Sequence, residues 1–93
     1  MTDQLHLDIC RTADRFWPQR DLPSRLRKLG EELGELHEAL LRFKLDEAEL
    51  EIADVAIVLS DLLYVMGRRS SLLDVMECKW NMNKEKWKRD GKL

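Results

Sequence analysis

The sequence predicts an all-α protein: a small antiparallel four-helix bundle that assembles as a dimer or a dimer of dimers. Only 4 glycines and 2 prolines interrupt its 93 residues. Leucine, glutamate, lysine and arginine, which favour helix, far outnumber β-branched residues. Apolar residues also recur at steps of three and four along most of the chain, which is the spacing of one helix face.

The first two helices are separated by a loop that contains both prolines. We expect the first helix over about 3–16 and the loop over 17–22, because the residue before each of Pro18 and Pro23 is pushed away from helical angles. The second helix is expected to start near Ser24, beside Pro23. It carries an apolar stripe that consists of Leu26, Leu29, Leu33, Leu36, Leu40 and Phe43.

The third helix is expected over about 47–66 and differs from the others in its hydrophobicity. Asp46, with Glu49 three residues later, predicts its N-cap. The stretch from 53 to 65 is apolar on nearly all sides, so several of its sides need to be covered. This helix therefore predicts association with another subunit.

The fourth helix follows a short turn. Gly67 is typical of the position just after a helix, and Ser70 or Ser71 is suited to cap a helix that runs to about Trp87. A chain of 93 residues leaves no room for a second core, so residues 1–93 are expected to form one domain.

Composition and charge exclude several classes of function. Lysine and arginine number 16 against 18 acids, so no basic excess exists for binding nucleic acid. The chain has no apolar run of about 18 residues and no secretory leader, so we expect no membrane partner and a cytoplasmic location. Cys10 and Cys78 lack zinc-site spacing and are expected to be reduced, packed thiols.

Two pairs of acids point to a metal site. Glu32 and Glu35, and likewise Glu51 and Asp54, lie three residues apart and so share one face of their helix. A helical hairpin that turns near residue 44 brings the two pairs level. Four converging carboxylates repel one another by several kcal/mol at an effective dielectric of about 20. A divalent cation relieves this repulsion, and all-oxygen ligands suit Mg²⁺, with Mn²⁺ as a substitute.

Spacing alone does not decide this, because the chain holds five acidic pairs three residues apart. The context favours the metal site: Asp54 begins the most apolar stretch, where an unpaired buried acid is costly. The alternative is that these acids complement helix dipoles or form surface ion pairs such as Lys28–Glu32.

The last helix carries a complementary charge. Lys79, Asn83 and Lys86 recur on one face, and two ammoniums with an amide near an acidic metal cluster suit a polyphosphate. The alternative is a solvated basic face at a helix C-terminus. Trp17, in the proline-flanked loop, is placed either to stack on a base or to close the end of the bundle.

Three segments together resemble a known family. They are KLGEELGEL at 28–36, EIADV at 51–55, and Lys79-x-x-x-Asn83-x-x-Lys86-Trp87. This combination resembles the MazG-like branch of the all-α nucleoside triphosphate pyrophosphatases, whose pattern is ExxE, a spacer and ExxD. The resemblance covers about residues 17–87.

The resemblance implies Mg²⁺-dependent hydrolysis of a nucleoside or deoxynucleoside triphosphate to the monophosphate and pyrophosphate. It also implies a homodimer or homotetramer with helices of both subunits around the site. Two rival functions stay open: a phosphoribosyl-ATP pyrophosphatase-like enzyme, and a non-catalytic helical oligomerisation or adaptor module. The resemblance implies that Glu35 orients or deprotonates water, that the metal ligands are Glu32, Glu35, Glu51 and Asp54, and that Lys79, Asn83 and Lys86 contact the substrate. We add Trp17 and Lys28 to the predicted substrate contacts.

Overall fold

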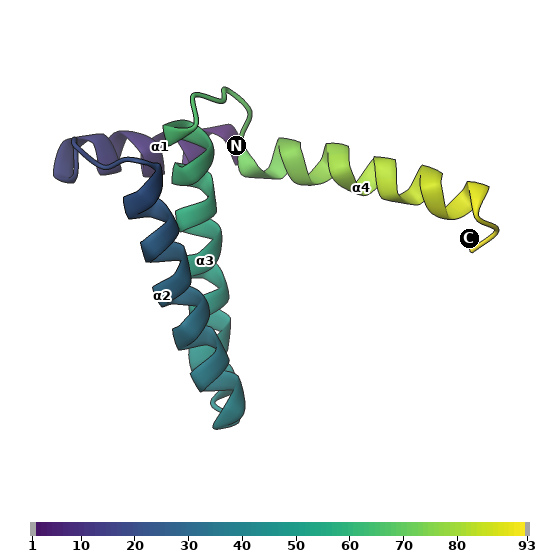
Figure 1. Ribbon diagram of the computed structural model, residues 1–93, viewed down its shortest axis with the longest axis horizontal. Coiled ribbons are helices and arrows are strands. Elements are labelled where there is room, and N and C mark those ends of the chain that lie inside the picture. Colours follow the sequence, from purple (N-terminus) through teal and green to yellow (C-terminus); the bar gives the residue numbers. More distant parts are fainter. Residues whose placement is uncertain (1, 93) are drawn as a thin grey trace.

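The computed structural model describes residues 2–92, and within that range the chain is helical with no strand (Figure 1). The all-α prediction is therefore confirmed for the described residues. The described part of the chain forms four helices, α1 (Thr2–Phe16), α2 (Leu22–Leu41), α3 (Leu45–Val65) and α4 (Leu72–Arg89).

Helices α2 and α3 form an antiparallel hairpin that is the main packed unit. They run side by side along most of their length in Figure 1. Ala39 and Ala48 are both buried next to the turn, where small side chains allow the two helices to approach closely. Phe43 in that turn has a φ of 57°, an uncommon conformation for a residue with a side chain. Helix α1 crosses the opposite end of the hairpin and packs on α3.

The N-terminus of α2 differs from the prediction. The helix begins at Leu22 and not near Ser24, because Asp21 is the N-cap. The Asp21 carboxylate accepts a hydrogen bond from the Ser24 backbone N–H at 2.9 Å, and the Asp21 N–H donates to Ser24 Oγ at 3.0 Å. This reciprocal pair is a capping box with serine in the third helical position. Pro23 lies in the first turn, where its missing N–H costs nothing.

One of the predicted caps of α3 and α4 is wrong, and the other two are confirmed. Asp46 is not the N-cap of α3, since the helix starts one residue before it and its N-cap, Lys44, makes no side-chain capping bond. Asp46 instead lies in the first turn, where its charge favours the helix dipole. Gly67, with a φ of 80°, follows the end of α3 as predicted. Ser71 caps α4, its Oγ accepting from the Asp74 N–H at 3.2 Å.

Helix α4 projects away from the rest of the chain (Figure 1). It touches α3 only near its own start, and no residue of α4 is buried. The bundle of four helices is thus not closed by one copy of the described residues. Large apolar side chains are left in solvent on several helices, among them Leu33 at 47%, Ile57 at 45% and Trp80 at 54% exposure. The hydrophobic side chains that are buried are small or medium-sized: Cys10, Ala13, Ala39, Ala48 and Val58.

None of the helices within residues 2–92 is long and apolar enough to cross a membrane.

Candidate metal centre

Three carboxylates from two helices meet on one side of the α2–α3 hairpin. Glu32 and Glu35 come from α2, one turn apart, and Glu51 comes from α3. One oxygen of each lies within 4.8 Å of the oxygens of the other two. The antiparallel turn produces this meeting, since it places the second half of α2 beside the first half of α3. Glu32 is buried, Glu51 is half-buried and Glu35 is exposed.

The charge of this cluster is only partly compensated. Lys28 Nζ lies 3.2 Å from Glu32 Oε1. The other oxygen of Glu32 and Oε2 of Glu51 are buried without a hydrogen-bond donor among the described residues. Burial, followed by the neighbouring carboxylates of Glu35 and Glu32, raises the pKa of Glu51 to about 7. Three carboxylates facing one ammonium, with two oxygens unpaired, form an arrangement that a cation would stabilise.

Asp54 lies apart from this trio. It is exposed on α3, and its oxygens are not within the 4.8 Å grouping of the other three. Asp54 lines the adjacent cavity together with Glu32. Of the four predicted metal ligands, the structure therefore brings three together and places the fourth on the neighbouring wall.

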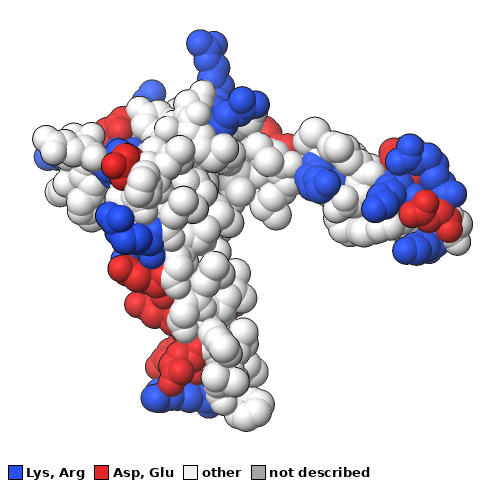
Figure 2. Space-filling model, in the orientation of Figure 1, with Lys and Arg blue, Asp and Glu red and all other residues white. Residues whose placement is uncertain are grey.

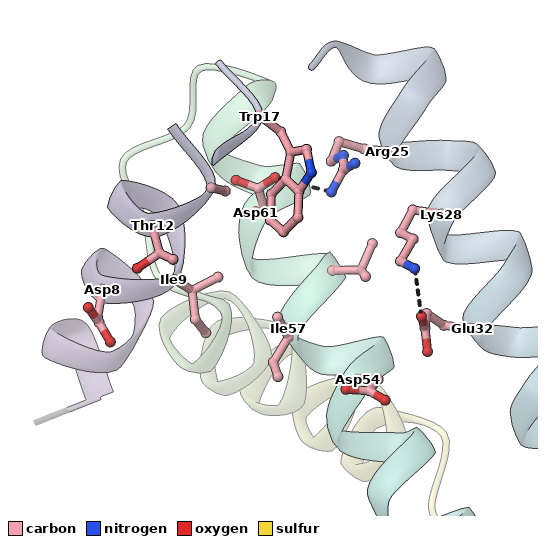
Figure 3. A pocket seen from close by; sticks show the side chains of 12 residues that line it. Asp8, Ile9, Thr12, Trp17, Arg25, Lys28, Glu32, Asp54, Ile57 and Asp61 are labelled. Atoms are coloured by element: carbon pink, nitrogen blue, oxygen red, sulfur yellow. Dashed lines mark ion pairs between the residues drawn. The ribbon is translucent and has the colours of Figure 1, made fainter. Parts of the chain in front are cut away.

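That cavity has a volume of about 480 Å³ and lies between α1, α2 and α3 (Figure 3). Lys28 and Glu32 form its wall on α2, and Trp17 lies at its loop end. The α1 and α3 walls combine apolar side chains, such as Ile9 and Ile57, with the carboxylates of Asp8, Asp54 and Asp61. This size and mixture are typical of small-molecule sites. The predicted contacts Trp17 and Lys28 thus line a real cavity beside the carboxylates.

The remaining predicted contacts lie elsewhere in the single chain. Lys79, Asn83 and Lys86 all lie on α4, which extends away from the hairpin (Figure 1). The space-filling view shows basic groups at the far end of α4 and acids along the hairpin (Figure 2). Lys79 and Asn83 border a surface hollow with Trp80. One copy of the chain does not bring these side chains to the carboxylates.

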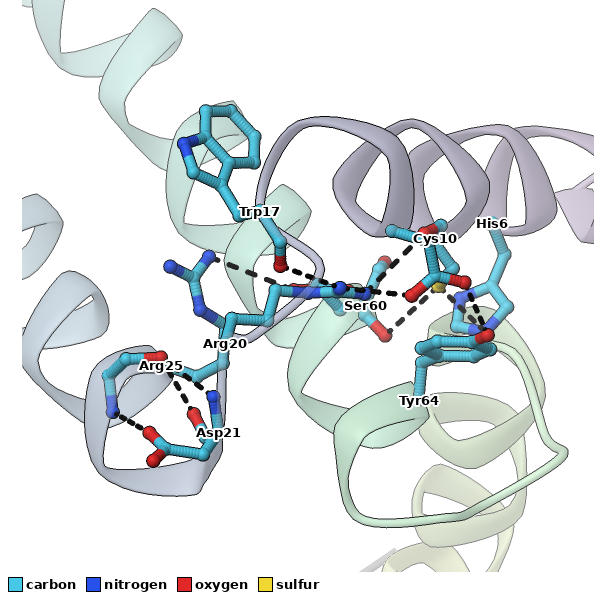
Figure 4. Close-up of polar contacts among 11 residues, drawn as sticks. His6, Cys10, Trp17, Arg20, Asp21, Arg25, Ser60 and Tyr64 are labelled. Atoms are coloured by element: carbon cyan, nitrogen blue, oxygen red, sulfur yellow. Dashed lines mark hydrogen bonds and ion pairs between the residues drawn. The ribbon is translucent and has the colours of Figure 1, made fainter.

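Sequence reasoning missed a second polar cluster, at the end of α3 (Figure 4). Arg20 donates from Nε and Nη2 to the two oxygens of Asp61, at 2.6 and 2.7 Å. Its Nη1 donates to Asp14 at 2.9 Å and to the Trp17 carbonyl at 3.2 Å. Tyr64 Oη also donates to Asp14, at 2.6 Å. The available signal was Asp61 itself, an acid on the most apolar helix, which requires a partner when it is buried.

The two cysteines differ in their environments. Cys10 is buried, with its Sγ 3.8 Å from His6 Nε2, and burial raises the pKa of its thiol to about 11. Cys78 is exposed on α4, so the prediction of two packed thiols is wrong for Cys78 in the single chain. It failed because, among the described residues, α4 contacts α3 only near its own start. Both thiols are free, as predicted.

No family model, curated protein or solved structure matches this chain.

Proposed function

We propose that this chain is a Mg²⁺-dependent pyrophosphohydrolase of nucleoside or deoxynucleoside triphosphates that releases the monophosphate and pyrophosphate. The observation that carries the proposal is the convergence of Glu32, Glu35 and Glu51 beside a cavity of small-molecule size. The cluster is all-oxygen, which is the donor set of a hard cation.

The residues fit such a cation. Two buried carboxylate oxygens, on Glu32 and Glu51, have no donor in the described part of the chain. Mg²⁺ in phosphate-handling sites is usually held by a few carboxylates and completes its shell with water and substrate oxygens. The exposed Glu35 leaves such an open side, and Asp54 on the cavity wall is placed to join when substrate is present.

Mg²⁺, when bound, would offset the charge of the triphosphate and lower the pKa of a nearby water. The side chains supply the rest of the chemistry. Glu35 is the exposed carboxylate of the trio and is suited to orient the attacking water and accept its proton. The Lys28 ammonium, on the same wall as Glu32, is placed to contact phosphate oxygens. Trp17 offers an aromatic face to a base.

A second copy of the chain completes this proposal. Lys79, Asn83 and Lys86 reach the carboxylates only if α4 of another copy packs against the hairpin, because their own α4 points away (Figure 1). The apolar side chains left in solvent on α2, α3 and α4 supply a surface for such packing. We therefore propose a homodimer or homotetramer. Light scattering should give two or four times 11.0 kDa, and a stable monomer would contradict this part of the proposal.

The test of activity is a panel of nucleoside and deoxynucleoside triphosphates incubated with Mg²⁺ and scored for monophosphate and pyrophosphate. We expect pyrophosphate release by the parent and a loss of about 100-fold or more in Glu51→Gln, the order found when one charge-stabilising group is removed from an active site. Glu49→Gln is the matched control, because Glu49 is an exposed acid of the same helix. Equal activity in both variants would remove the assignment, and an absence of hydrolysis in the parent would favour a non-catalytic oligomerisation module.

A further inference from the structure

The loop end of the cavity carries a guanidinium that the proposed chemistry does not use. Arg25 lines the cavity from α2, beside Trp17 and Asp61 (Figure 3). It precedes Glu32 by seven residues, which is about 10 Å along a helix. A ligand that lies along this wall with its phosphates near Glu32 would have its other end near Arg25.

The Arg25 guanidinium has hydrogen-bond donors that no acceptor among the described residues satisfies. Its side chain is only 16% exposed, and its Nε is buried with no acceptor among residues 2–92. The nearest acid is Asp61, whose Oδ2 lies 3.7 Å from Arg25 Nη1. Both oxygens of Asp61 already accept short bonds from Arg20, at 2.6 and 2.7 Å. Because an unsatisfied buried donor is costly, this guanidinium is suited to a ligand with acceptor atoms.

The surroundings of Arg25 indicate what kind of ligand. The cavity walls on α1 and α3 carry apolar side chains (Ile9, Ala13, Ile57 and Val58) as well as polar ones (Asp8, Thr12, Asp54 and Asp61). The apolar groups, together with the aromatic ring of Trp17, suit a flat heterocycle, whereas a polyphosphate would lose its hydration against them. The phosphates are better placed at the polar end, near Lys28 and Glu32.

We propose that Arg25 is a specificity-determining residue that donates two hydrogen bonds to the acceptor edge of a 6-oxopurine base lodged beside Trp17. An arginine pairs with the neighbouring O6 and N7 acceptors of such a base, whereas adenine presents an amino donor at position 6. The site consequently selects 6-oxopurine nucleotides over adenine nucleotides. This inference rests on the proposed function, since it names the substrate class of the same cavity.

The test compares inosine triphosphate with ATP, two substrates that share sugar, phosphates and ring size. We expect the parent to have a kcat/KM at least about tenfold higher for inosine triphosphate, within the range that one bidentate base contact provides. In Arg25→Gln the ratio should fall to about one or below, because glutamine pairs with adenine. Arg25→Met should lose the preference without gaining one for ATP.

Arg27→Gln is the matched control, because Arg27 is an exposed arginine of the same helix and should keep the parental ratio. Helicity and melting temperature of each variant show that it is folded. A parental ratio near one, or a ratio unchanged in folded Arg25→Gln and Arg25→Met, overturns the inference and leaves the proposed function standing.

If the parent hydrolyses no triphosphate, the proposed function fails, and the inference is then decided by calorimetric binding of inosine monophosphate against AMP. A preference for inosine monophosphate that Arg25→Gln removes supports the inference. Equal binding of the two, or no binding of either, overturns it.

Discussion

Arg20 and Asp61 lie 41 positions apart in the chain and form a two-bond ion pair with only 4% and 3% of their side chains exposed. The same guanidinium donates to the carbonyls of Trp17 and Cys10, at 3.2 and 3.4 Å. One side chain thus joins the loop before α2, the end of α1 and the last turns of α3. The Arg20–Asp61 pair therefore holds together the end of the cavity that Trp17 and Asp61 line.

Removing one member of this pair should destabilise the fold strongly. We expect Arg20→Met to lower the free energy of unfolding by about 3–5 kcal/mol, because the buried Asp61 carboxylate loses both of its short bonds and keeps only the 3.7 Å contact with Arg25. Urea unfolding at a fixed chain concentration measures the effect, the concentration being held constant because association shifts apparent stability.

The control for Arg20→Met is Arg42→Met. Arg42 also pairs with an acid at 2.7 Å, but both partners are more than half exposed. An exposed pair spaced four residues apart on a helix contributes about 0.3–0.5 kcal/mol. Equal losses of unfolding free energy in Arg20→Met and Arg42→Met would contradict a stabilising role for the buried Arg20–Asp61 pair.

The contact between Tyr64 and Asp14 should make stability depend on acidity. The Tyr64 hydroxyl, followed by the Arg20 guanidinium, lowers the pKa of Asp14 below its usual 3.8. A carboxyl with a lowered pKa stabilises the native state above its unfolded pKa, and this contribution is lost as pH falls through the native value. Tyr64→Phe should therefore lose stability near neutral pH, and the loss should shrink below about pH 4.

Urea unfolding at several pH values, in the parent, Tyr64→Phe and Asp14→Asn, tests this dependence. The double variant Tyr64→Phe/Asp14→Asn should lose less unfolding free energy than the sum of the two single losses, because both changes remove the same hydrogen bond. A loss in Tyr64→Phe that is constant across the acidic range would mean that the hydroxyl does not stabilise the charged carboxylate.

The buried thiol should be inert in the native protein. Burial, as the main cause, raises the pKa of Cys10 to about 11, so almost no thiolate exists at neutral pH, and thiolate is the reactive form. In Cys78→Ser, which leaves Cys10 as the single thiol, we expect no rapid reaction with an aromatic disulfide reagent. One full equivalent should react in urea, and rapid labelling without urea would contradict the packing of α1 on α3.

Much of this architecture follows from local sequence signals. The steps of three and four from Leu26 to Leu40 predict α2, Gly67 predicts the end of α3, and Ser71 predicts the start of α4, because each acts within one or two helical turns. The proximity of Glu32, Glu35 and Glu51 could be predicted from their spacing and from one hairpin turn between α2 and α3.

Contacts between distant segments could not be predicted in this way. The partner of Asp61 is Arg20, in a loop whose path depends on how α1 packs, and spacing within one helix carries no such information. Helix α2 starts two residues before Ser24, because Asp21 is its N-cap and forms a reciprocal capping box with Ser24. The projection of α4 could not be predicted either, because its apolar pattern led us to expect packing, whereas Trp80 and Met82 are exposed within residues 2–92.

Crowding of the carboxylates should appear as a pH effect in metal-free protein. The pKa of Glu51 is raised from 4.5 to about 7 by burial and by its acidic neighbours. A carboxyl with a raised pKa stabilises the native state below its unfolded pKa, and that contribution disappears as pH rises through the native value. With a chelator present, the parent should therefore lose stability between about pH 4.5 and 7, relative to Glu51→Gln. Parallel stability curves for the parent and Glu51→Gln would contradict the raised pKa.

Titration of Mg²⁺ into metal-free protein, followed by calorimetry and by melting temperature, tests most directly whether Glu32, Glu35 and Glu51 hold a cation. We predict that millimolar Mg²⁺ binds and raises the melting temperature of the parent and of Glu49→Gln, because a ligand of the native state stabilises it by mass action. Glu51→Gln should show neither heat nor shift. Binding of equal strength in Glu51→Gln, or no binding by the parent, would contradict the account.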